Sequence, residues 1–415
     1  MQEKVPGIMS VVKEHLKRMK LSEIWKGLKD PRSERNLKWS FDYMMRIATL
    51  GMLSGCKNLR AVETFSEIFD ERIPDTTIHD ILVEIDPEPL RQTVVRGVKD
   101  ALRDHELPKE EFPVRVTAID GKSIAVSGTV VGPFSQPISG GGEGTFRNMA
   151  LRAFHVSNET KLFLGQREIH GKTGEPVELR PFIDDLVNDY GNTTLLEVIS
   201  VDAGMTSKAN AEYIKGKGLH YIMALKGPQH FLFGEAQRLF ADLIKPLKVS
   251  TELCNGKEVI RELYRHSLPS GCGSWEHLRE FWLVKQSVID SGGKITREDR
   301  YFLSSLPAKN LSNAHVLEAV RMHWGVENNG FWICDTVWQE DDAPWANDAL
   351  VLTSHLRLIA YNIVSRLQTR RLRSAKARAL SWSGILRFIE HACCQLKNYF
   401  MIEMVALEEP AALAA

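Results

Sequence analysis

The sequence predicts an α/β fold in which helices pack against a mixed β-sheet, with a helical region ahead of that sheet. Residues 8 to about 105 carry apolar side chains at helical spacing. From residue 114 to residue 225, short apolar runs alternate with helical segments. Their order is strand, strand, strand, helix, strand, helix, strand, which favours a mixed sheet with helices against it.

The helical region contains several recognisable helix starts. Residues 39–56 place apolar side chains close to the 3.6-residue period, and residues 58–69 continue as a second helix. Residues 75–77 provide a cap for a third helix, and residues 86–89 start a fourth with prolines in its first turn. We therefore predict a helical N-terminal domain over residues 1–108.

Strands are expected over residues 114–119, 151–156, 163–169, 195–201 and 220–225, and helices over residues 175–189 and 207–215. The second and third strands are expected to form a hairpin that turns at residues 157–159. The Gly-rich loop at residues 139–144 lacks a Lys-Ser or Lys-Thr ending and does not lead into a helix. This composition favours a flexible loop over a phosphate cradle.

Residues 247 to about 305 alternate as β-strands, which predicts a β-rich insertion at about 230–308. Further helices are expected over residues 311–331, 350–367 and 384–400. The sheet and its insertion are assigned to a domain over residues 109–365. Residues 366–415 are assigned to a basic helical C-terminal region, because residues 366–378 carry six Lys and Arg and no acid.

The composition is that of an ordinary globular protein. The chain has 415 residues, of which 43% are hydrophobic and 26% charged, and its formal net charge is zero, so the total charge identifies no partner. Six cysteines without a CxxC pair indicate a reduced chain. Since no secretory signal and no apolar run of about 18 residues occur, we expect a cytoplasmic protein.

Three carboxylates occupy apolar settings in which acids are rarely buried alone. Asp120 and Asp202 each end a predicted strand, at the sheet edge where active sites collect. Glu327 is expected on one helix face with Val316, Val320, His323, Trp324 and Phe331. Clustered carboxylates repel unless a cation neutralises them, and Mg²⁺ or Mn²⁺ suits their oxygens. The alternative is that the two aspartates cap turns.

Short motifs surround these carboxylates. They are Ala-Ile-Asp-Gly-Lys at 118–122, Ser-Val-Asp-Ala-Gly at 200–204 and Arg-Met-His-Trp-Gly-Val-Glu-Asn at 321–328, with further segments at 30–32, 172–175, 221–229 and 339–341. Together they resemble bacterial insertion-sequence transposases of the DDE class, and most of all the H-repeat-associated transposase family. The likeness covers roughly residues 20–370. The chain departs from the family pattern at Phe331, where relatives commonly have histidine.

The resemblance implies an RNase H-like core with a β-rich insertion before its last catalytic helix. It also implies cleavage of DNA at transposon ends by a metal-activated water, followed by attack of the freed 3′-hydroxyl on target DNA. Asp120, Asp202 and Glu327 would be the catalytic residues and would bind Mg²⁺ or Mn²⁺, as two ions. The expected partners are double-stranded DNA, comprising terminal repeats and target, and a second copy of the chain on that DNA, close to the bacterial nucleoid.

Two other functions remain open on this evidence. One is a metal-dependent nuclease on the same fold, and the other is a domesticated DNA-binding protein without catalysis. Strand-transfer products would distinguish a transposase from a nuclease. Salt-sensitive DNA binding without cleavage would indicate the inactive protein.

Several other residues are candidates for DNA contacts. Lys122 and Lys226 flank the expected site and are predicted to meet phosphates, with a solvated lysine as the equal alternative. His323 is predicted to contact DNA or a carboxylate, and a core histidine is the alternative. The basic segment 366–378 is predicted to contact the DNA backbone rather than to form only a solvated helix face, through Arg370, Arg371 and Arg373.

Two further features have competing interpretations. Glu175 is either a fourth acidic member of the site or a charge at a helix N-terminus, and the second interpretation is favoured. Four tryptophans, Trp324, Trp332, Trp338 and Trp345, are closely spaced. Packing in the core is favoured for them over stacking on a DNA base.

Overall fold

The computed structural model describes residues 5–33, 37–127, 134–137, 146–242, 245–342, 345–346 and 349–401. The Gly-rich loop at 139–144 lies outside these ranges. Across the described helices, none combines the length and the apolar character that a membrane crossing requires.

Five helices precede the sheet, in agreement with the predicted helical region. They are α1 (Val5–Arg18), α2 (Phe41–Leu53), α3 (Leu59–Ser66), α4 (Asp75–Leu82) and α5 (Glu88–Arg103). The side chains of Ser40 and Asn58 cap α2 and α3 by accepting hydrogen bonds from backbone N–H groups of the first turn. Local sequence therefore sets where these two helices begin.

The sheet contains β1 (Val116–Ser127), β2 (Ser135–Pro137), β3 (Phe146–His155), β4 (Leu162–Ile169), β5 (Val198–Val201), β6 (His220–Leu225), β7 (Lys248–Cys254), β8 (Lys257–Ser267), β9 (Glu280–Ile289), β10 (Ile295–Ser304) and β11 (Trp345–Ala346). Their order is β2-β3-β1-β5-β6-β10-β9-β8-β7, while β4 pairs with β3 and β11 with β1. The predicted hairpin of the second and third strands is the antiparallel pair β3 and β4.

Five of these strands form an RNase H-like core. In the order β4-β3-β1-β5-β6, β3 is antiparallel to both β4 and β1, and β5 and β6 run parallel to β1. The helices α6 (Glu175–Tyr190) and α7 (Lys208–Gly216) connect β4 to β5 and β5 to β6. The predicted fold class is thus confirmed, and the parallel strands bring their carboxyl ends to one edge.

The prediction that the first strand ends before Asp120 is wrong. The ladder between β1 and β3 runs without a break from Thr117 opposite His155 to Ala125 opposite Arg147. An Asp-Gly pair is typical of a turn, but the hydrogen bonds of a nine-residue ladder outweigh that local preference. Asp120 therefore lies inside β1 rather than at its end.

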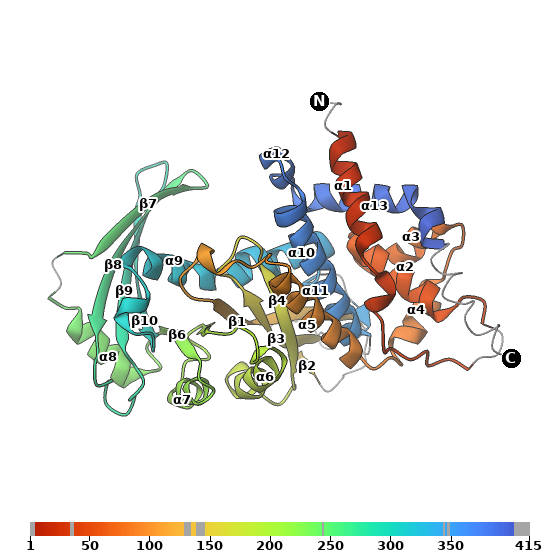
Figure 1. Cartoon of the computed structure of the whole chain (residues 1–415). Coiled ribbons are helices and arrows are strands. Elements are labelled where there is room, and N and C mark those ends of the chain that lie inside the picture. Colours follow the sequence, from red (N-terminus) through yellow and green to blue (C-terminus); the bar gives the residue numbers. More distant parts are fainter. Residues whose placement is uncertain are drawn as a thin grey trace.

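The β-rich insertion extends the same sheet. It begins with α8 (His230–Leu239) and continues through β7 to β10, and β10 pairs antiparallel with β6. In Figure 1 these strands form an arm that projects from the core on the side away from the N-terminal helices. The predicted position of the insertion, before the helix that leads to Glu327, agrees with this arrangement.

Helices cover both faces of the sheet (Figure 1). One apolar cluster joins α6, α7 and α8 to one face. The other joins the opposite face to the N-terminal helices and to α9 (Asn313–His323), α10 (Trp332–Trp338), α11 (Leu350–Arg366) and α13 (Trp382–Gln395). The π-helices η5 (Val326–Phe331) and η6 (Leu367–Arg371) follow α9 and α11, and α12 spans Ala375–Arg378. The last long helix, α13, packs against α1 and α2, so helices from the first and last parts of the described chain contact each other.

Candidate active site

Strand register places Asp120 beside Asp202. The parallel pairing of β1 with β5 ends at Ile119 opposite Val201, so the next residue of each strand is an aspartate. From that point β1 continues and β5 stops, so both carboxylates lie where the two strands cease to pair. Adjacent strands lie about 4.8 Å apart, so the two backbones are direct neighbours here. The side chain of Asp202 also accepts a hydrogen bond from the Met205 N–H (3.1 Å), which fixes the loop after β5.

Glu327 reaches the same region from η5, which contacts β1. The predicted burial of Glu327 on an apolar helix face is wrong, because Glu327 is exposed while its neighbour Val326 is fully buried. Within the predicted face, Val316, Val320, His323 and Phe331 are buried, whereas Trp324 and Glu327 are exposed. The face therefore holds through α9 and changes where η5 begins.

A π-turn follows this change of face. The N–H of Trp332 bonds to the carbonyl of Glu327, five residues earlier, which shifts the helical register. Gly330 packs tightly here, since a Cβ at this position would lie 3.0 Å from the Phe163 ring. Gly330 and the buried Phe331 thus allow the segment to lie close to the sheet. Short π-segments of this kind occur frequently at functional sites.

The electrostatics of Asp120 show that acidic side chains surround it. Burial raises the pKa of Asp120 to about 7, and the negative charges of Glu327, Asp202 and Glu175 add to this effect. A hydrogen bond from the Gly121 N–H acts in the opposite direction. In the described structure none of these four carboxylates has a Lys or Arg partner within ion-pair distance. The group therefore carries negative charge that no Lys or Arg of the described ranges neutralises by an ion pair.

Glu175 is the member of this group that the sequence analysis interpreted as a helix-terminal charge. It is the first residue of α6, and its Oε1 lies only 1.8 Å from the position that a Cβ on Gly121 would occupy. Burial, followed by the charge of Asp202, raises the pKa of Glu175. Glu175 thus lies against β1 beside Asp120, and only glycine at position 121 leaves room for it.

The four acidic side chains suit a hard divalent cation, since the atoms that they offer as ligands are all carboxylate oxygens. As the side chains stand, however, the described residues contain no three Asp, Glu, His or Cys groups close enough to share one ion. Mutual repulsion keeps uncompensated carboxylates apart. The exposed Glu327 side chain is free to rotate toward Asp120 and Asp202, so this chemistry and placement fit a cation that would draw the three together.

His323 lies behind Asp202 in the core. Its Nδ1 is 3.1 Å from the Ser200 hydroxyl on β5, and the side chain is buried. Burial lowers the pKa of His323 to about 4, while Asp202 and Ser200 oppose that effect. The imidazole is therefore neutral at pH 7, and its position corresponds to the core histidine that the sequence analysis gave as the alternative.

The two candidate lysines differ in their surroundings. Lys122 is 5% exposed, forms an ion pair with Asp335 and lies over the Phe331 ring. Lys226 directly follows β6 and is exposed. Gln229 accepts from the Lys226 N–H (3.3 Å) and donates to the Thr206 carbonyl (2.9 Å). The turn that carries Lys226 is thus tied to the loop after Asp202.

The basic segment 366–378 is largely ion-paired. Arg370 bonds to Glu111 (2.8 Å) and Arg371 to Glu106 (2.6 Å), while Arg373 is exposed and has no ion pair in the described ranges. The segment contains no acid, but the fold supplies acids from the connection between α5 and β1. Arg370 and Arg371 thus have partners that the local sequence did not indicate.

The tryptophans differ in burial, so core packing, the interpretation favoured over base stacking, applies to only some of them. Trp338 is fully buried and donates to the Met52 carbonyl (2.9 Å), so the prediction of core packing is confirmed for it. For Trp324 and Trp332 that prediction is wrong, because they are 38% and 60% exposed. The side chain of Trp345 lies outside the described structure. Two exposed indoles therefore flank the segment that carries Glu327.

Replacing Asp120 with asparagine is expected to stabilise the metal-free protein at pH 8. The folded state must ionise Asp120 near pH 7, whereas the unfolded chain does so near 3.8, so ionisation costs stability as the pH rises from about 4 to about 7. Asp120→Asn removes that cost, on the order of 2–4 kcal/mol at pH 8, and its advantage disappears toward pH 4. Urea unfolding in EDTA at both pH values measures this difference.

The control is Asp299→Asn, which changes an exposed aspartate on β10 and should leave stability unchanged at both pH values. A free energy of unfolding for Asp120→Asn equal to or below that of the wild type at pH 8 would contradict the raised pKa of Asp120.

Comparisons with known proteins place this site in a family. Residues 111–363 match the family described as "Transposase DDE domain". "Putative transposase YncI" of Escherichia coli O157:H7 is 24% identical over 362 residues, which cover 81% of this chain and 84% of that protein. "H repeat-associated putative transposase YhhI" of Escherichia coli strain K12 is 25% identical over 388 residues, which cover 83% and 90%.

Among solved structures, a piggyBac transposase synaptic complex with hairpin DNA aligns with a TM-score of 0.40 and 12% sequence identity, covering 97% of this chain and 80% of that chain. The strand order described above identifies the fold independently of that alignment. The matched range 111–363 spans more than half of the chain and contains Asp120, Glu175, Asp202 and Glu327. The predicted likeness to H-repeat-associated transposases is confirmed, and the chain belongs to the transposase DDE domain family.

Proposed function

We propose that this transposase cleaves DNA at the ends of its own element and joins those ends to target DNA, with Asp120, Asp202 and Glu327 as the residues that hold the catalytic cations. The observation that carries the proposal is that these carboxylates come from β1, from the end of β5 and from η5, that the charges of Asp202 and Glu327 act on Asp120, and that no described Lys or Arg forms an ion pair with them. A structural cluster of acids would be expected to include basic partners.

Magnesium or manganese fits the oxygen donors of the site. Two such ions, held by these carboxylates, would supply charge stabilisation for the reacting oxygens at phosphorus. Asp120, Asp202 and Glu175 would contribute to holding them, because the charges of Asp202 and Glu175 both act on Asp120. Glu175 would then hold a cation or a water beside Asp120 rather than serve only α6.

The remaining residues act on the DNA substrate. The exposed Lys226 follows β6, the neighbour of β5, and its ammonium would neutralise a phosphate close to Asp202. Lys122 would act indirectly, because its ion pair with Asp335 ties β1 to α10. His323, neutral and bonded to Ser200, would keep the end of β5 in position behind Asp202.

Two copies of the chain would act together, since moving an element requires both of its ends to be cut and joined. The experiment that tests the function uses the full-length protein with duplexes that carry one element end. The expected results are nicking at that end in Mg²⁺ and no nicking in EDTA. Pre-nicked ends with a free 3′-hydroxyl are expected to join to a target plasmid.

The products separate this function from its alternatives. Nicking without joined products would replace the transposase with a nuclease on the same fold. Salt-sensitive binding without nicking or joining would indicate a DNA-binding protein that has lost catalysis. Nicking that persists in EDTA would contradict the role given to the three carboxylates.

A further inference from the structure

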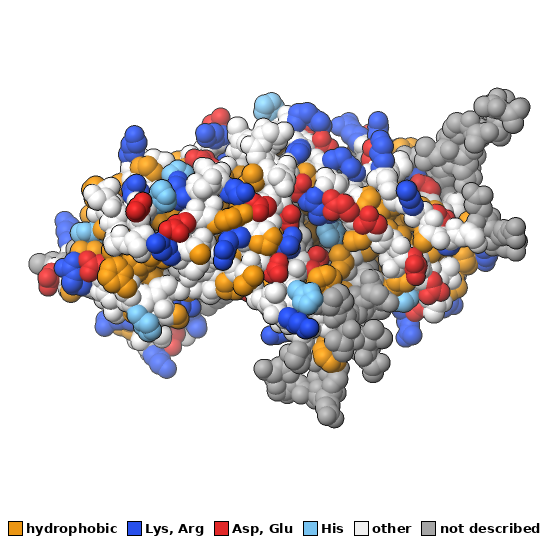
Figure 2. All heavy atoms as spheres, turned by 90° about the horizontal axis from the view of Figure 1, so that it is seen from below, with side chains coloured by type: hydrophobic (Ala, Val, Ile, Leu, Met, Phe, Trp, Pro, Cys, Tyr) orange, Lys and Arg blue, Asp and Glu red, His pale blue; other side chains and the backbone are white. Residues whose placement is uncertain are grey.

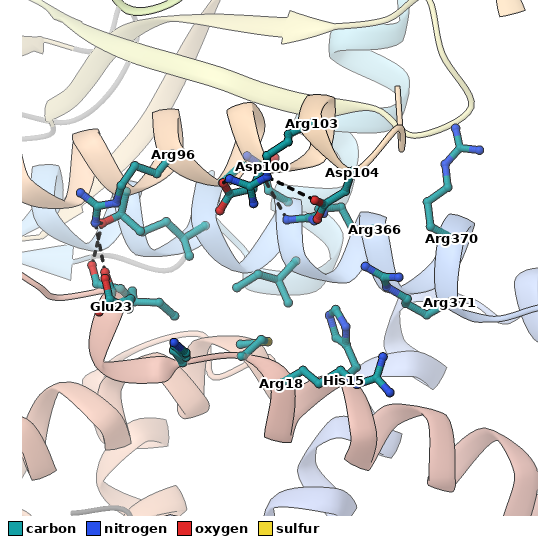
Figure 3. A pocket seen from close by; sticks show the side chains of 18 of the residues that line it. His15, Arg18, Glu23, Arg96, Asp100, Arg103, Asp104, Arg366, Arg370 and Arg371 are labelled. Atoms are coloured by element: carbon teal, nitrogen blue, oxygen red, sulfur yellow. Dashed lines mark hydrogen bonds and ion pairs between the residues drawn. The ribbon is translucent and has the colours of Figure 1, made fainter. Parts of the chain in front are cut away.

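A cavity of about 1090 Å³ lies between α1, α5 and the end of α11 with η6. Figure 3 shows side chains from all three elements around it, with His15 and Arg18 on α1, Arg103 on α5, and Arg366 and Arg371 on the third. The cavity is long in this view, with Arg96 at one end and Arg370 at the other. We call it the α1–α5 groove.

The groove carries an excess of positive charge. Nine Lys and Arg line it, against four Asp and Glu. Asp100 and Asp104, two of those four acids, form ion pairs with Arg103 across one wall. By contrast, on the face that bears α6 and α7, acidic and basic side chains are interspersed (Figure 2). The groove is therefore distinguished from that face by the sign of its charge.

Three of the lining cations are uncommitted. Arg18, Lys20 and Arg373 are exposed and form no ion pair with any residue that the structure describes. Arg18 and Lys20 come from α1 and the residues after it, and Arg373 follows η6, so they approach the groove from two different walls. Their charges remain available to an anion in the groove.

Other cations of the groove are held in place by ion pairs. Arg366 and Arg371 both bond to the single carboxylate of the buried Glu106, at 2.5 Å and 2.6 Å, so one acid serves two guanidinium groups. Arg366 also reaches Asp104 at 3.4 Å. These pairs hold the arginines in place and balance their charge, so the positive excess of the groove comes from its other cations.

The pKa of His15 is affected by these positive charges. Burial is the main cause that lowers the pKa of His15 to about 4, and the charges of Arg371, Arg366 and Arg18 contribute to the lowering. Its Nε2 is buried and has no hydrogen-bond partner in the described structure. A neutral imidazole thus lies in a wall where additional positive charge is unfavourable and negative charge would be stabilised.

We propose that the α1–α5 groove binds the phosphodiester backbone of duplex DNA, an inference that rests on the proposed transposase function. A single small anion would need one compact set of donors, whereas here cations are distributed along a groove, which matches the repeated charge of a DNA strand. The contacts made by Arg18, Lys20 and Arg373 position the DNA and carry no sequence information.

The groove lies apart from the carboxylates. Arg370 at its end bonds to Glu111, which precedes β1, and lies 4.0 Å from Glu159 in the turn between β3 and β4. The chain then runs along β1 toward Asp120. The DNA in the groove is therefore a stretch other than the reacting phosphodiester, and its loss should weaken binding without altering the chemical step.

The test compares two triple variants of the full-length protein. The groove variant is Arg18→Gln, Lys20→Gln and Arg373→Gln. The control removes the same charge from exposed positions on the β-rich arm, as Lys257→Gln, Lys294→Gln and Arg297→Gln. Fluorescence anisotropy with a duplex of about 30 base pairs, in EDTA and over a range of salt, gives the dissociation constant and its salt dependence.

The groove variant is expected to bind at least about tenfold more weakly at moderate salt, with a salt slope smaller by about 3, one for each lost phosphate contact. The loss should be equal for unrelated DNA sequences, and Arg18→Lys with Arg373→Lys should retain binding.

A groove variant with the wild-type slope, or a control variant that loses as much binding, would overturn the proposal. So would a loss confined to one DNA sequence, because backbone contacts do not discriminate bases. Failure of the wild-type protein to bind any DNA would instead overturn the transposase function itself. Unfolding curves of the variants establish that both fold, since all six side chains are exposed.

Discussion

Mg²⁺-dependent nicking and strand transfer are expected to fall at least about 10³-fold in each of Asp120→Asn, Asp202→Asn and Glu327→Gln. Each substitution keeps the shape of the side chain and removes the charge that would hold a cation. The loss corresponds to several kcal/mol of charge stabilisation at phosphorus, which the remaining carboxylates cannot replace. The measurement is the initial rate of nicking on an element end, together with the yield of joined product.

Stability and binding separate this loss from unfolding. Asp120→Asn should be more stable than the wild type at pH 8 in EDTA, so an inactive Asp120→Asn protein would not be an unfolded one. Addition of Mg²⁺ should raise the melting temperature of the wild type and not that of the variant. All three variants should still bind DNA, because the proposed backbone contacts lie elsewhere.

Exposed carboxylates on the β-rich arm provide matched controls. Asp299→Asn on β10 and Glu258→Gln on β8 remove the same charge from positions outside the site, and they should keep wild-type nicking. Wild-type rates in Asp120→Asn, Asp202→Asn and Glu327→Gln would remove the basis for assigning the reaction to this site.

Glu340→Ala is expected to destabilise the protein by about 3–5 kcal/mol. Glu340, Arg152 and Arg357 are all fully buried. The Glu340 carboxylate accepts from both terminal nitrogens of Arg152, at 2.6 Å and 2.7 Å, and from Arg357 at 3.0 Å. Alanine would leave two buried guanidinium groups without their anion. Urea unfolding at pH 7 measures the difference.

The pKa of Glu340 expresses the same balance. Burial acts to raise this pKa, but Arg152 and Arg357 outweigh burial and hold it below its ordinary value. A lowered carboxyl pKa contributes stability that is present above the ordinary value of 4.5 and is lost as the pH falls. The stability gap between wild type and Glu340→Ala should therefore narrow under acid conditions.

A surface pair provides the comparison for Glu340. Glu298 bonds to Arg300 at 2.7 Å but is about half exposed, so Glu298→Ala should cost less than about 1 kcal/mol. A change of that small size in Glu340→Ala would mean that the buried triad does not stabilise the fold. The triad also bears on the site, because Arg152 lies directly opposite Asp120 in the ladder between β1 and β3.

Much of the secondary structure follows from local sequence. Strand β6 is observed at its predicted bounds, and α6 within one residue of them. A short apolar run bounded by turn residues leaves few alternatives to a buried strand, and a long amphipathic segment with an early proline leaves few alternatives to a helix. The first strand was different, because Asp120 and Gly121 favour a turn locally and only pairing with β3 extends the strand through them.

The structure bears on the placement of the carboxylates that the sequence proposed for the site. Asp120 and Asp202 were expected to converge because parallel strands bring their carboxyl ends together, and the register of β1 with β5 places them side by side. The exposure of Glu327 was not predictable from the helical period, since α9 ends at His323 and its period does not continue unbroken to Glu327. Glu175 was interpreted as a charge at the N-terminus of its helix. Its contact with β1 depends on Gly121, where a Cβ would collide with the Glu175 carboxylate.

By itself, the sequence determined the α/β class, the order of the elements and the family, and it supplied the three carboxylates proposed for the site. These follow from side-chain periodicity and from motifs that depend on a few consecutive residues. Only the tertiary structure decided that Glu175 joins the carboxylates, that Glu327 is exposed, and that Arg366 and Arg371 share Glu106. Each of these depends on contacts between residues far apart in the chain, and local sequence contains no information on the distance between them.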